Sequence, residues 1–120
     1  MIPNLFILYV SNPPISSKFY QTLFDKEPDV VLPTWAAFSF DNGLNLGLWS
    51  TNAHDFASCG EGNRTEISFM VENIQVVDEL YQRWMTFGVQ IEQEPKQAVF
   101  GKTFVALDPD GHRLRVCIPD

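Results

Sequence analysis

The feature that most constrains the fold of this chain is a repeat at about half its length. The segment Leu8–Asn12 (LYVSN) resembles Phe69–Asn73 (FMVEN), and each precedes an amphipathic segment that carries a tyrosine, Tyr20 or Tyr81. Such repetition is typical of two copies of one supersecondary unit that stack to bury a common core. The sequence therefore predicts an α+β protein made of two βαβββ modules.

The first half shows how one such module is encoded. An apolar run ends at Ser11–Pro14, and the next apolar residues recur at helical spacing, with Ser16 or Ser17 as the expected N-cap. Asp41-Asn42-Gly43 then separates two strand-forming runs, which predicts a tight hairpin. The expected strands are 5–10, 30–32, 35–40 and 44–49, and the expected helix is 14–25.

The second half predicts the same order of elements. A strand at 67–71 leads into a helix that begins near Ile74 and ends at Gly88. A short strand at 89–91 follows, and Asp108–Gly111 is a turn between two further strands. We expect one domain, 1–120, with modules 1–50 and 65–120, a linker 51–64, and the last two strands at 102–107 and 112–118.

Charge and length restrict the partners. The chain has 120 residues, with 8 basic against 15 acidic side chains, so nucleic acid and anionic membrane surfaces are not expected partners. No leader or membrane segment is expected, and Cys59 and Cys117 are expected to be free thiols of a cytoplasmic protein. A small molecule or another protein chain is the more natural partner.

Strand alternation predicts which residues face away from the helices. Those faces are expected to form a shared concave cleft, and in small α+β proteins such a hollow is where a ligand binds. The residues expected to line it are Leu5, Ile7, Tyr9, Asn45, Gly47, Trp49, Glu66, Ser68, Met70, Arg113, Arg115 and Cys117. By the same alternation Phe6, Leu8 and Val10 are expected to pack beneath the first helix.

The duplicated strand–helix openings, Phe19-Tyr20 and the closing Asp108–His112 (DPDGH) resemble the vicinal oxygen chelate superfamily of glyoxalases, bleomycin-resistance proteins and dioxygenases. The resemblance implies a curled mixed sheet. Metal-dependent members of that superfamily use four positions that here hold Leu5, Gly47, Glu66 and Arg115. One carboxylate beside an arginine cannot ligate a divalent ion, so we expect no metal, no cofactor and no catalytic residue.

Within the superfamily, the segments Tyr9–Asn12, Lys26–Pro28, Leu48–Ser50, Val99–Phe104 and Arg115–Cys117 resemble the phenazine antibiotic-resistance binding proteins. This resemblance implies a bacterial homodimer that sequesters a planar aromatic molecule without turnover. The expected ligand-binding residues are Trp49, Trp35, Tyr9, Ile7, Glu66, Ser68, Met70, Phe100 and Arg115.

Several of these assignments have alternatives. Glu66 and Arg115 could form a bidentate ion pair with a purely structural role, and Trp49 could fill a core or a dimer interface. Trp84 is expected in the core, and His54 and His112 are expected to face solvent. The alternative functions are an enzyme acting on an aromatic or carbonyl compound, and a regulatory or structural dimer whose cleft is filled by its own side chains.

Overall fold

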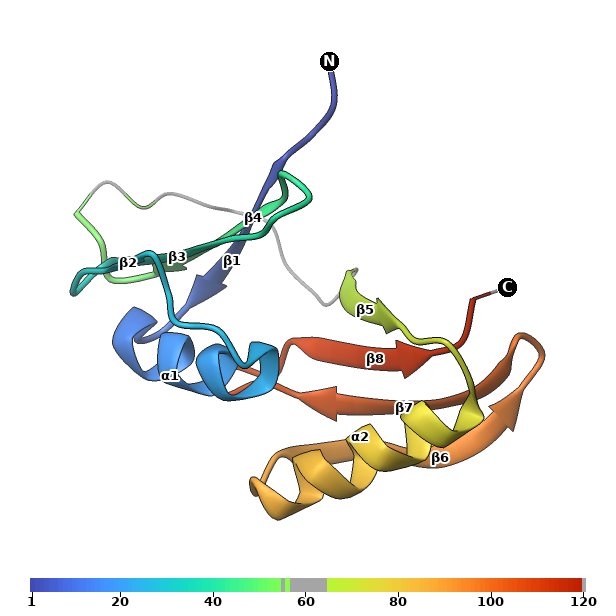
Figure 1. The fold of residues 1–120 in the computed structure, drawn as a ribbon. Coiled ribbons are helices and arrows are strands. Elements are labelled where there is room, and N and C mark those ends of the chain that lie inside the picture. Colours follow the sequence, from blue (N-terminus) through green and yellow to red (C-terminus); the bar gives the residue numbers. More distant parts are fainter. Residues whose placement is uncertain (55, 57–64, 120) are drawn as a thin grey trace. The chain divides into compact units, whose positions relative to one another are not determined.

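The computed structural model describes residues 1–54, 56 and 65–119, and the chain divides into two compact units, residues 1–60 and 61–120 (Figure 1). The first unit contains β1 (Leu5–Val10), α1 (Pro13–Phe24), β2 (Val30–Val31), β3 (Trp35–Ser39) and β4 (Asn45–Ser50). Its sheet has the order β1-β4-β3-β2, with β1 parallel to β4 and the other pairs antiparallel.

The second unit repeats this topology. It contains β5 (Glu66–Met70), α2 (Ile74–Thr86), β6 (Gln90–Ala98), β7 (Gly101–Leu107) and β8 (Arg113–Cys117). The sheet order is β5-β8-β7-β6, and the first and last strands of the unit are again parallel neighbours. The predicted α+β class and the two βαβββ modules are confirmed.

Both helices begin at an asparagine, and this corrects the predicted serine cap. The Asn12 side chain accepts a hydrogen bond from the Ile15 amide at 3.2 Å, and the Asn73 side chain accepts one from the Val76 amide at 3.1 Å. Ser16 is buried inside α1. The helix begins earlier than predicted because Pro13-Pro14 occupies its first turn, where proline is favoured.

Strand β6 is longer than predicted. Residues 90–98 are mostly polar and show no clear apolar face, so the sequence predicted a strand only at the start of this segment. The register of β6 against β7 shifts between Gln93 and Lys96, around Pro95. A β-bulge on an edge strand can hold a proline because the missing amide costs no ladder bond there.

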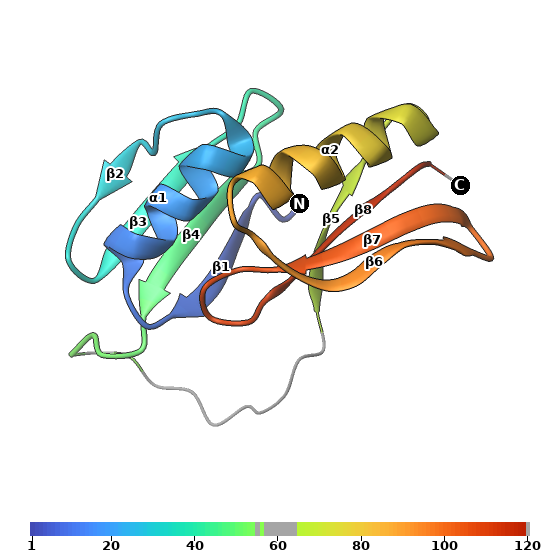
Figure 2. The ribbon, with the colours of Figure 1, turned by 90° about the horizontal axis from the view of Figure 1, so that it is seen from below.

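Each helix covers one face of its own sheet. Helix α1 packs on β3 and β4, as Figure 2 shows, and Leu48 and Phe38 are fully buried beneath it. Phe6 was expected beneath α1 but is 55 % exposed, because α1 lies away from β1 at the sheet edge. In the second unit α2 covers β6, β7 and β8, and Trp84 is 2 % exposed, as predicted for a core residue. In the described part of the chain, neither helix has the length and apolar composition of a membrane span.

Candidate functional site

The first unit carries an uncharged, partly aromatic face opposite α1. Strand pairing sets Tyr9 beside Trp49 and Trp49 beside Trp35, so these side chains form a row across β1, β4 and β3. The next row is Ile7, Gly47 and Ala37. Side chains of directly paired residues lie on the same face of a sheet. None of the described strand residues that pairing places on this face is charged: Leu5, Ile7, Tyr9, Val30, Trp35, Ala37, Ser39, Asn45, Gly47 and Trp49.

A phenylalanine from the segment after β4 completes an aromatic cluster on this face. The Phe56 ring centroid lies 4.9 Å from that of Tyr9 and 5.2 Å from that of Trp49, both with edge contacts. The ring centroids of Tyr9 and Trp49 lie 6.2 Å apart. Phe56 was not predicted as a site residue because it lies in the polar linker. The signal that could have indicated it is a single aromatic residue among small polar residues.

Trp35 lies close to the row that contains Gly47. A Cβ atom placed on Gly47 would lie 2.9 Å from Cζ3 and 3.0 Å from Cζ2 of Trp35, and closer still to Cη2. The six-membered ring of Trp35 therefore covers Gly47. This explains why Gly47 is buried while Ile7, beside it in the same row, is 42 % exposed.

The face opposite α2 in the second unit is charged. The Arg115 Nε donates to Glu66 Oε1 at 2.6 Å and Nη2 donates to Oε2 at 3.5 Å, which is the bidentate pair expected from the sequence. Arg115 Nη1 donates to the Thr103 hydroxyl at 3.1 Å, and the guanidinium carbon lies 5.6 Å from the Phe100 ring centroid. Arg115 is thus held between a carboxylate, a buried hydroxyl and an aromatic ring.

Arg113 extends this network. Its Nε lies 2.9 Å from Glu92 Oε1, and its Nη1 lies 3.9 Å from Glu66 Oε2. The hydrogen bond from Arg115, followed by the charges of Arg115 and Arg113, holds the pKa of Glu66 below its usual value, against the opposing effect of burial. Glu66 is therefore a carboxylate at neutral pH. Sequence reasoning missed Glu92 and Thr103 because neither is near these residues in the chain.

The other residues predicted for the second unit lie around this pair. The Ser68 hydroxyl donates to Glu66 Oε1 at 3.4 Å. Met70 is 71 % exposed on the same face, paired with Cys117. The structure thus brings together Ile7, Tyr9, Trp35 and Trp49 in one unit, and Glu66, Ser68, Met70, Phe100 and Arg115 in the other.

The pairing registers make the two units comparable residue by residue. Leu5 and Glu66 each begin the first strand of a unit. Gly47 pairs with Ile7 as Arg115 pairs with Ser68, so Gly47 and Arg115 are equivalent. Of these four positions only Glu66 offers a metal ligand, and Arg115 occupies both of its oxygens. Among the described residues no group of three Asp, Glu, His or Cys side chains is placed to hold a metal, so the donor set does not fit a divalent ion.

The expectation that His112 faces solvent is wrong. Its Nδ1 lies 2.7 Å from Oδ2 of the buried Asp108, and its side chain is 24 % exposed. The hydrogen bond to Asp108 raises the pKa of His112, against the opposing effect of burial. Asp108 Oδ1 also accepts hydrogen bonds from the Asp110 and His112 amides. This pair fixes the turn between β7 and β8, whereas His54 is exposed as predicted.

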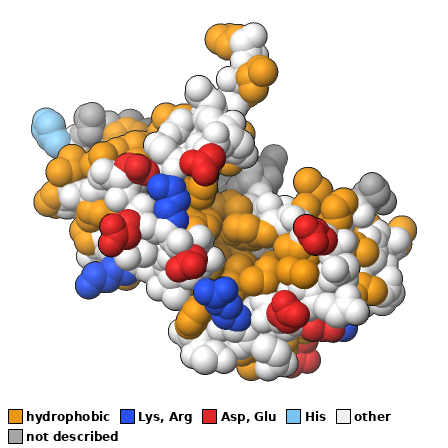
Figure 3. All heavy atoms as spheres, in the orientation of Figure 1, with side chains coloured by type: hydrophobic (Ala, Val, Ile, Leu, Met, Phe, Trp, Pro, Cys, Tyr) orange, Lys and Arg blue, Asp and Glu red, His pale blue; other side chains and the backbone are white. Residues whose placement is uncertain are grey.

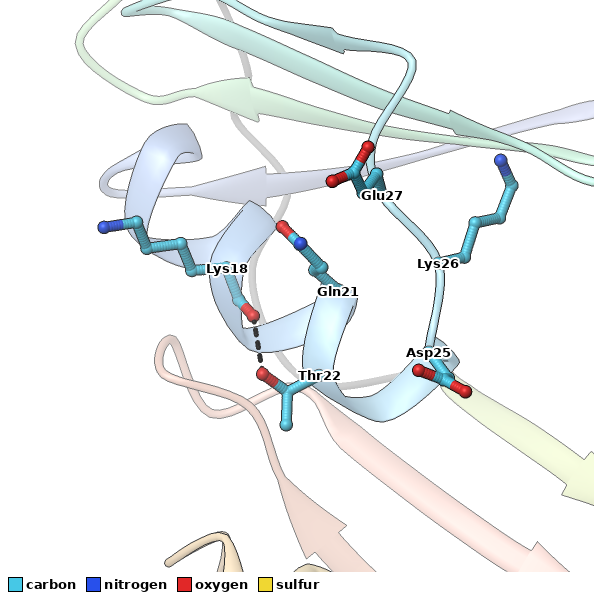
Figure 4. Close-up of a pocket in the computed structure, with 6 residues that line it drawn as sticks. All are labelled: Lys18, Gln21, Thr22, Asp25, Lys26 and Glu27. Atoms are coloured by element: carbon cyan, nitrogen blue, oxygen red, sulfur yellow. Dashed lines mark hydrogen bonds between the residues drawn. The ribbon is translucent and has the colours of Figure 1, made fainter.

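A separate depression lies at the C-terminal end of α1 (Figure 4). It has a volume of about 550 Å³, is open to solvent and is lined by Lys18, Gln21, Thr22, Asp25, Lys26 and Glu27. In Figure 4 the two lysine amines point away from each other, and the Thr22 hydroxyl donates to the Lys18 carbonyl. The depression therefore lacks the converging polar groups and apolar walls of a ligand site.

Charge is mixed on the face of the molecule seen in Figure 3. On the face seen in Figure 3, the described Lys and Arg side chains lie among Asp and Glu side chains, and apolar atoms remain uncovered between them.

Comparison with known proteins gives one family. The model of the Glyoxalase/Bleomycin resistance protein/Dioxygenase superfamily matches residues 2–116. The phenazine antibiotic resistance protein EhpR of Enterobacter agglomerans is 36 % identical over 118 residues, which cover 96 % of this chain and 90 % of that protein.

Solved structures show the same fold. The protein ATC0852 of Agrobacterium tumefaciens, solved by NMR in solution, is 43 % identical with a TM-score of 0.86 and covers 100 % of this chain and 98 % of its own. A glyoxalase-related enzyme of Fulvimarina pelagi has a TM-score of 0.81 at 19 % identity, over 98 % of this chain and 88 % of its own. The latter likeness concerns the fold alone.

Proposed function

Because the chain belongs to the glyoxalase/bleomycin resistance protein/dioxygenase superfamily, we propose that it is a cytoplasmic protein that binds and sequesters a planar aromatic molecule, such as a phenazine-type antibiotic. The proposal takes its ligand class from the relative that confers phenazine resistance. It takes its mechanism, binding without a metal and without turnover, from the residues of the two faces.

The observation that carries the proposal is the aromatic row Tyr9–Trp49–Trp35 on an uncharged face. Tyr9 is 45 % exposed on the edge strand β1, so its ring is open to solvent. Large flat side chains on an open sheet face supply apolar area and stacking geometry for a flat ring. Burial of a three-ring molecule against such a face contributes about 25 cal/mol per Å² of apolar surface removed from water.

Arg115 is the proposed partner of the polar edge of the ligand. Its guanidinium has five N–H groups, of which three are engaged by Glu66 and Thr103. The remaining donors suit a carboxylate or carbonyl oxygen. Ser68, Met70 and Phe100 complete the proposed contact set of the second unit together with Glu66, while Ile7 belongs to the proposed contacts of the first unit.

The chemistry of the donor set favours binding over catalysis. Glu66, the one carboxylate among the four family ligand positions, is held by Arg115 at 2.6 Å, so it is neither a free metal ligand nor a free base. We therefore assign no catalytic residue and no cofactor. An enzyme of the same family would release a changed product from the same probe, which mass spectrometry of the incubated ligand would detect.

The proposal is tested by tryptophan fluorescence titration of the purified protein with phenazine and phenazine-1-carboxylic acid. We expect saturable quenching that is lost or weakened about tenfold in Trp49→Ala, because a stacked ring contributes roughly 1 kcal/mol beyond its buried area. Phe87→Ala is the matched control, since Phe87 is an exposed aromatic residue beyond α2. Equal affinity of wild type and Trp49→Ala for both probes would overturn the stacking role.

One observation favours a second candidate, a face filled by its own side chain. Phe56 contacts Tyr9 and Trp49 where a ligand ring would stack. In that case Phe56→Ala would lower the free energy of unfolding, and neither probe would bind. In a ligand-binding protein the same substitution leaves binding intact or strengthens it, because it uncovers the aromatic row.

We also propose a homodimer, in which a second copy covers apolar surface near the edge strand β1. This strand exposes Leu5, Phe6, Ile7 and Tyr9, and an uncovered apolar edge strand promotes uncontrolled association. Light scattering after size-exclusion chromatography should give twice the mass of 13.7 kDa. A monomer at micromolar concentration would contradict the assignment.

A further inference from the structure

Gly47 stands in the middle of β4, where glycine is unfavourable unless something approaches the backbone closely. Among the glycines that the structure describes, those with positive φ are Gly43, Gly88, Gly101 and Gly111, and Gly47 is not one of them. Its backbone conformation is therefore open to any residue. The reason for glycine at this position must be space.

That space is taken by Trp35. A Cβ on Gly47 would lie within 3.0 Å of three carbons of the six-membered ring, a separation that real Cβ atoms do not show. Trp35 is the direct cross-strand partner of Trp49, and Gly47 is two residues before Trp49 on β4. The contact is therefore a diagonal one between β3 and β4, which is within reach of a side chain as long as tryptophan.

The second unit has the same diagonal contact with different chemistry. Thr103 pairs with Cys117 as Trp35 pairs with Trp49, so Thr103 is equivalent to Trp35 and Arg115 to Gly47. In the second unit these positions meet through the hydrogen bond from the Arg115 Nη1 to the Thr103 hydroxyl, at 3.1 Å. At this position the second unit thus has the Arg115 guanidinium, whereas the first unit has the indole ring of Trp35, which comes from the neighbouring strand β3.

We propose that Gly47 is a positioning residue for the aromatic site of the first unit. Because it has no side chain, the Trp35 ring can lie over it, at the position that is equivalent to Arg115 of the second unit. This part of the first unit therefore presents an uncharged ring, which suits the ring system of a planar ligand. The inference rests on the proposed function for the nature of the ligand. The contact between Trp35 and the backbone of Gly47 rests on the geometry of the first unit alone. A methyl group at position 47 displaces the ring, which is the far end of a side chain and can rotate away.

A double-mutant cycle with Gly47→Ala, Trp35→Ala and the double variant tests this pairing. Phenazine and phenazine-1-carboxylic acid are titrated against each variant with the fluorescence of the tryptophans that the variant retains as the signal. We expect Gly47→Ala and Trp35→Ala each to weaken phenazine binding by about tenfold, and the double variant to bind no more weakly than Trp35→Ala. The two losses are not additive because both remove the same placed ring. Wild-type affinity in Gly47→Ala, or additive losses in the double variant, would overturn the inference.

A second measurement keeps the inference separate from the proposed function. If wild type binds neither probe, the proposed function fails. The double-mutant cycle then uses the free energy of unfolding in urea and the near-ultraviolet circular dichroism of the tryptophans in place of ligand affinity. Gly47→Ala should then change the tryptophan signal and lower stability when Trp35 is present, and should do neither in Trp35→Ala. An equal effect of Gly47→Ala in both backgrounds would show that glycine serves the strand itself, and the inference would fail.

Discussion

Glu66 and Arg115 show how one pair of residues can decide the chemistry of a whole face. The carboxylate that could have held a metal instead accepts hydrogen bonds from the guanidinium at 2.6 and 3.5 Å. Arg115 is 17 % exposed and Glu66 30 % exposed, so water screens the pair only partly. A charge pair in this setting fixes side-chain positions more than it stabilises the fold.

The pair predicts a pH dependence of stability. Arg115 holds the folded-state pKa of Glu66 below 4.5, so the stabilisation is present above about pH 4.5 and is lost as the pH falls through the folded-state pKa. We expect Glu66→Gln to lower the free energy of unfolding by about 1 kcal/mol near neutral pH and to approach wild type in acid. Urea unfolding at several pH values measures this, with Glu94→Gln as the control for an exposed glutamate on β6. A constant difference between Glu66→Gln and wild type across that range would contradict the assignment.

The face on which a side chain lies could be predicted from the sequence, because it depends on the strand itself. Contacts between side chains of neighbouring strands could not be predicted, because they depend on how the strands pair. Alternation placed Arg115, Tyr9 and Trp49 on the faces opposite the helices, because the period of a strand is fixed. It could not predict that Trp35 reaches diagonally to Gly47, because that contact depends on the register of β3 against β4.

At the scale of elements, the two asparagine caps are the clearest trace of the duplication. Asn12 and Asn73 occupy the same place in the repeat and accept hydrogen bonds from the amide three residues later. Each substitution to alanine should lower the free energy of unfolding by about 1 kcal/mol, because one orphan amide of the helix start loses its acceptor. Urea unfolding of the two variants measures the loss.

Asn4→Ala is the control for the caps, because Asn4 precedes β1 and contributes its backbone carbonyl to the Asn45 contacts. A cap variant as stable as Asn4→Ala would show that the helix starts elsewhere in solution. The repeat indicates asparagine caps at Asn12 and Asn73, but Ser16 and Ser17 compete as cap candidates because serine is also a favoured cap. Pro13 and Pro14 were the stronger signal.

The turn between β7 and β8 predicts the opposite pH dependence. Asp108 raises the folded-state pKa of His112 above 6.5, so the extra stability is complete below about pH 6.5 and is lost as the pH rises through the folded-state pKa. We expect His112→Asn to abolish this fall in the free energy of unfolding, which should be about 1 kcal/mol or less. Denaturant unfolding from mildly acidic to alkaline pH measures it. His54→Asn, an exposed histidine, should retain the wild-type profile, and an unchanged profile in His112→Asn would contradict the role of the pair.

At the scale of the whole molecule, duplication followed by divergence explains why two equivalent faces differ in chemistry. The fold class and the order of elements were predictable, because the repeat, the Asp41-Asn42-Gly43 hairpin and the Asp108–Gly111 turn are local signals. The length of β6 was not, since its residues alternate without an apolar face and include Pro95. Phe56 was not predictable either, because its contacts with Tyr9 and Trp49 are made outside any regular element.

The same divergence supports the proposal that ligand binding needs no metal. Leu5 and Gly47 have no donor atom, Arg115 is a cation, and Glu66 is engaged by it. Restoring a ligand set would require new donors at several positions, and any side chain at position 47 meets the Trp35 ring. We therefore expect dialysis against EDTA to leave phenazine affinity unchanged, and added Zn²⁺ or Ni²⁺ to leave it unchanged as well. Fluorescence titration before and after dialysis, with elemental analysis of each sample, measures both. Loss of binding on dialysis and recovery with one equivalent of metal per chain would show that donors outside these four positions hold an ion in the site.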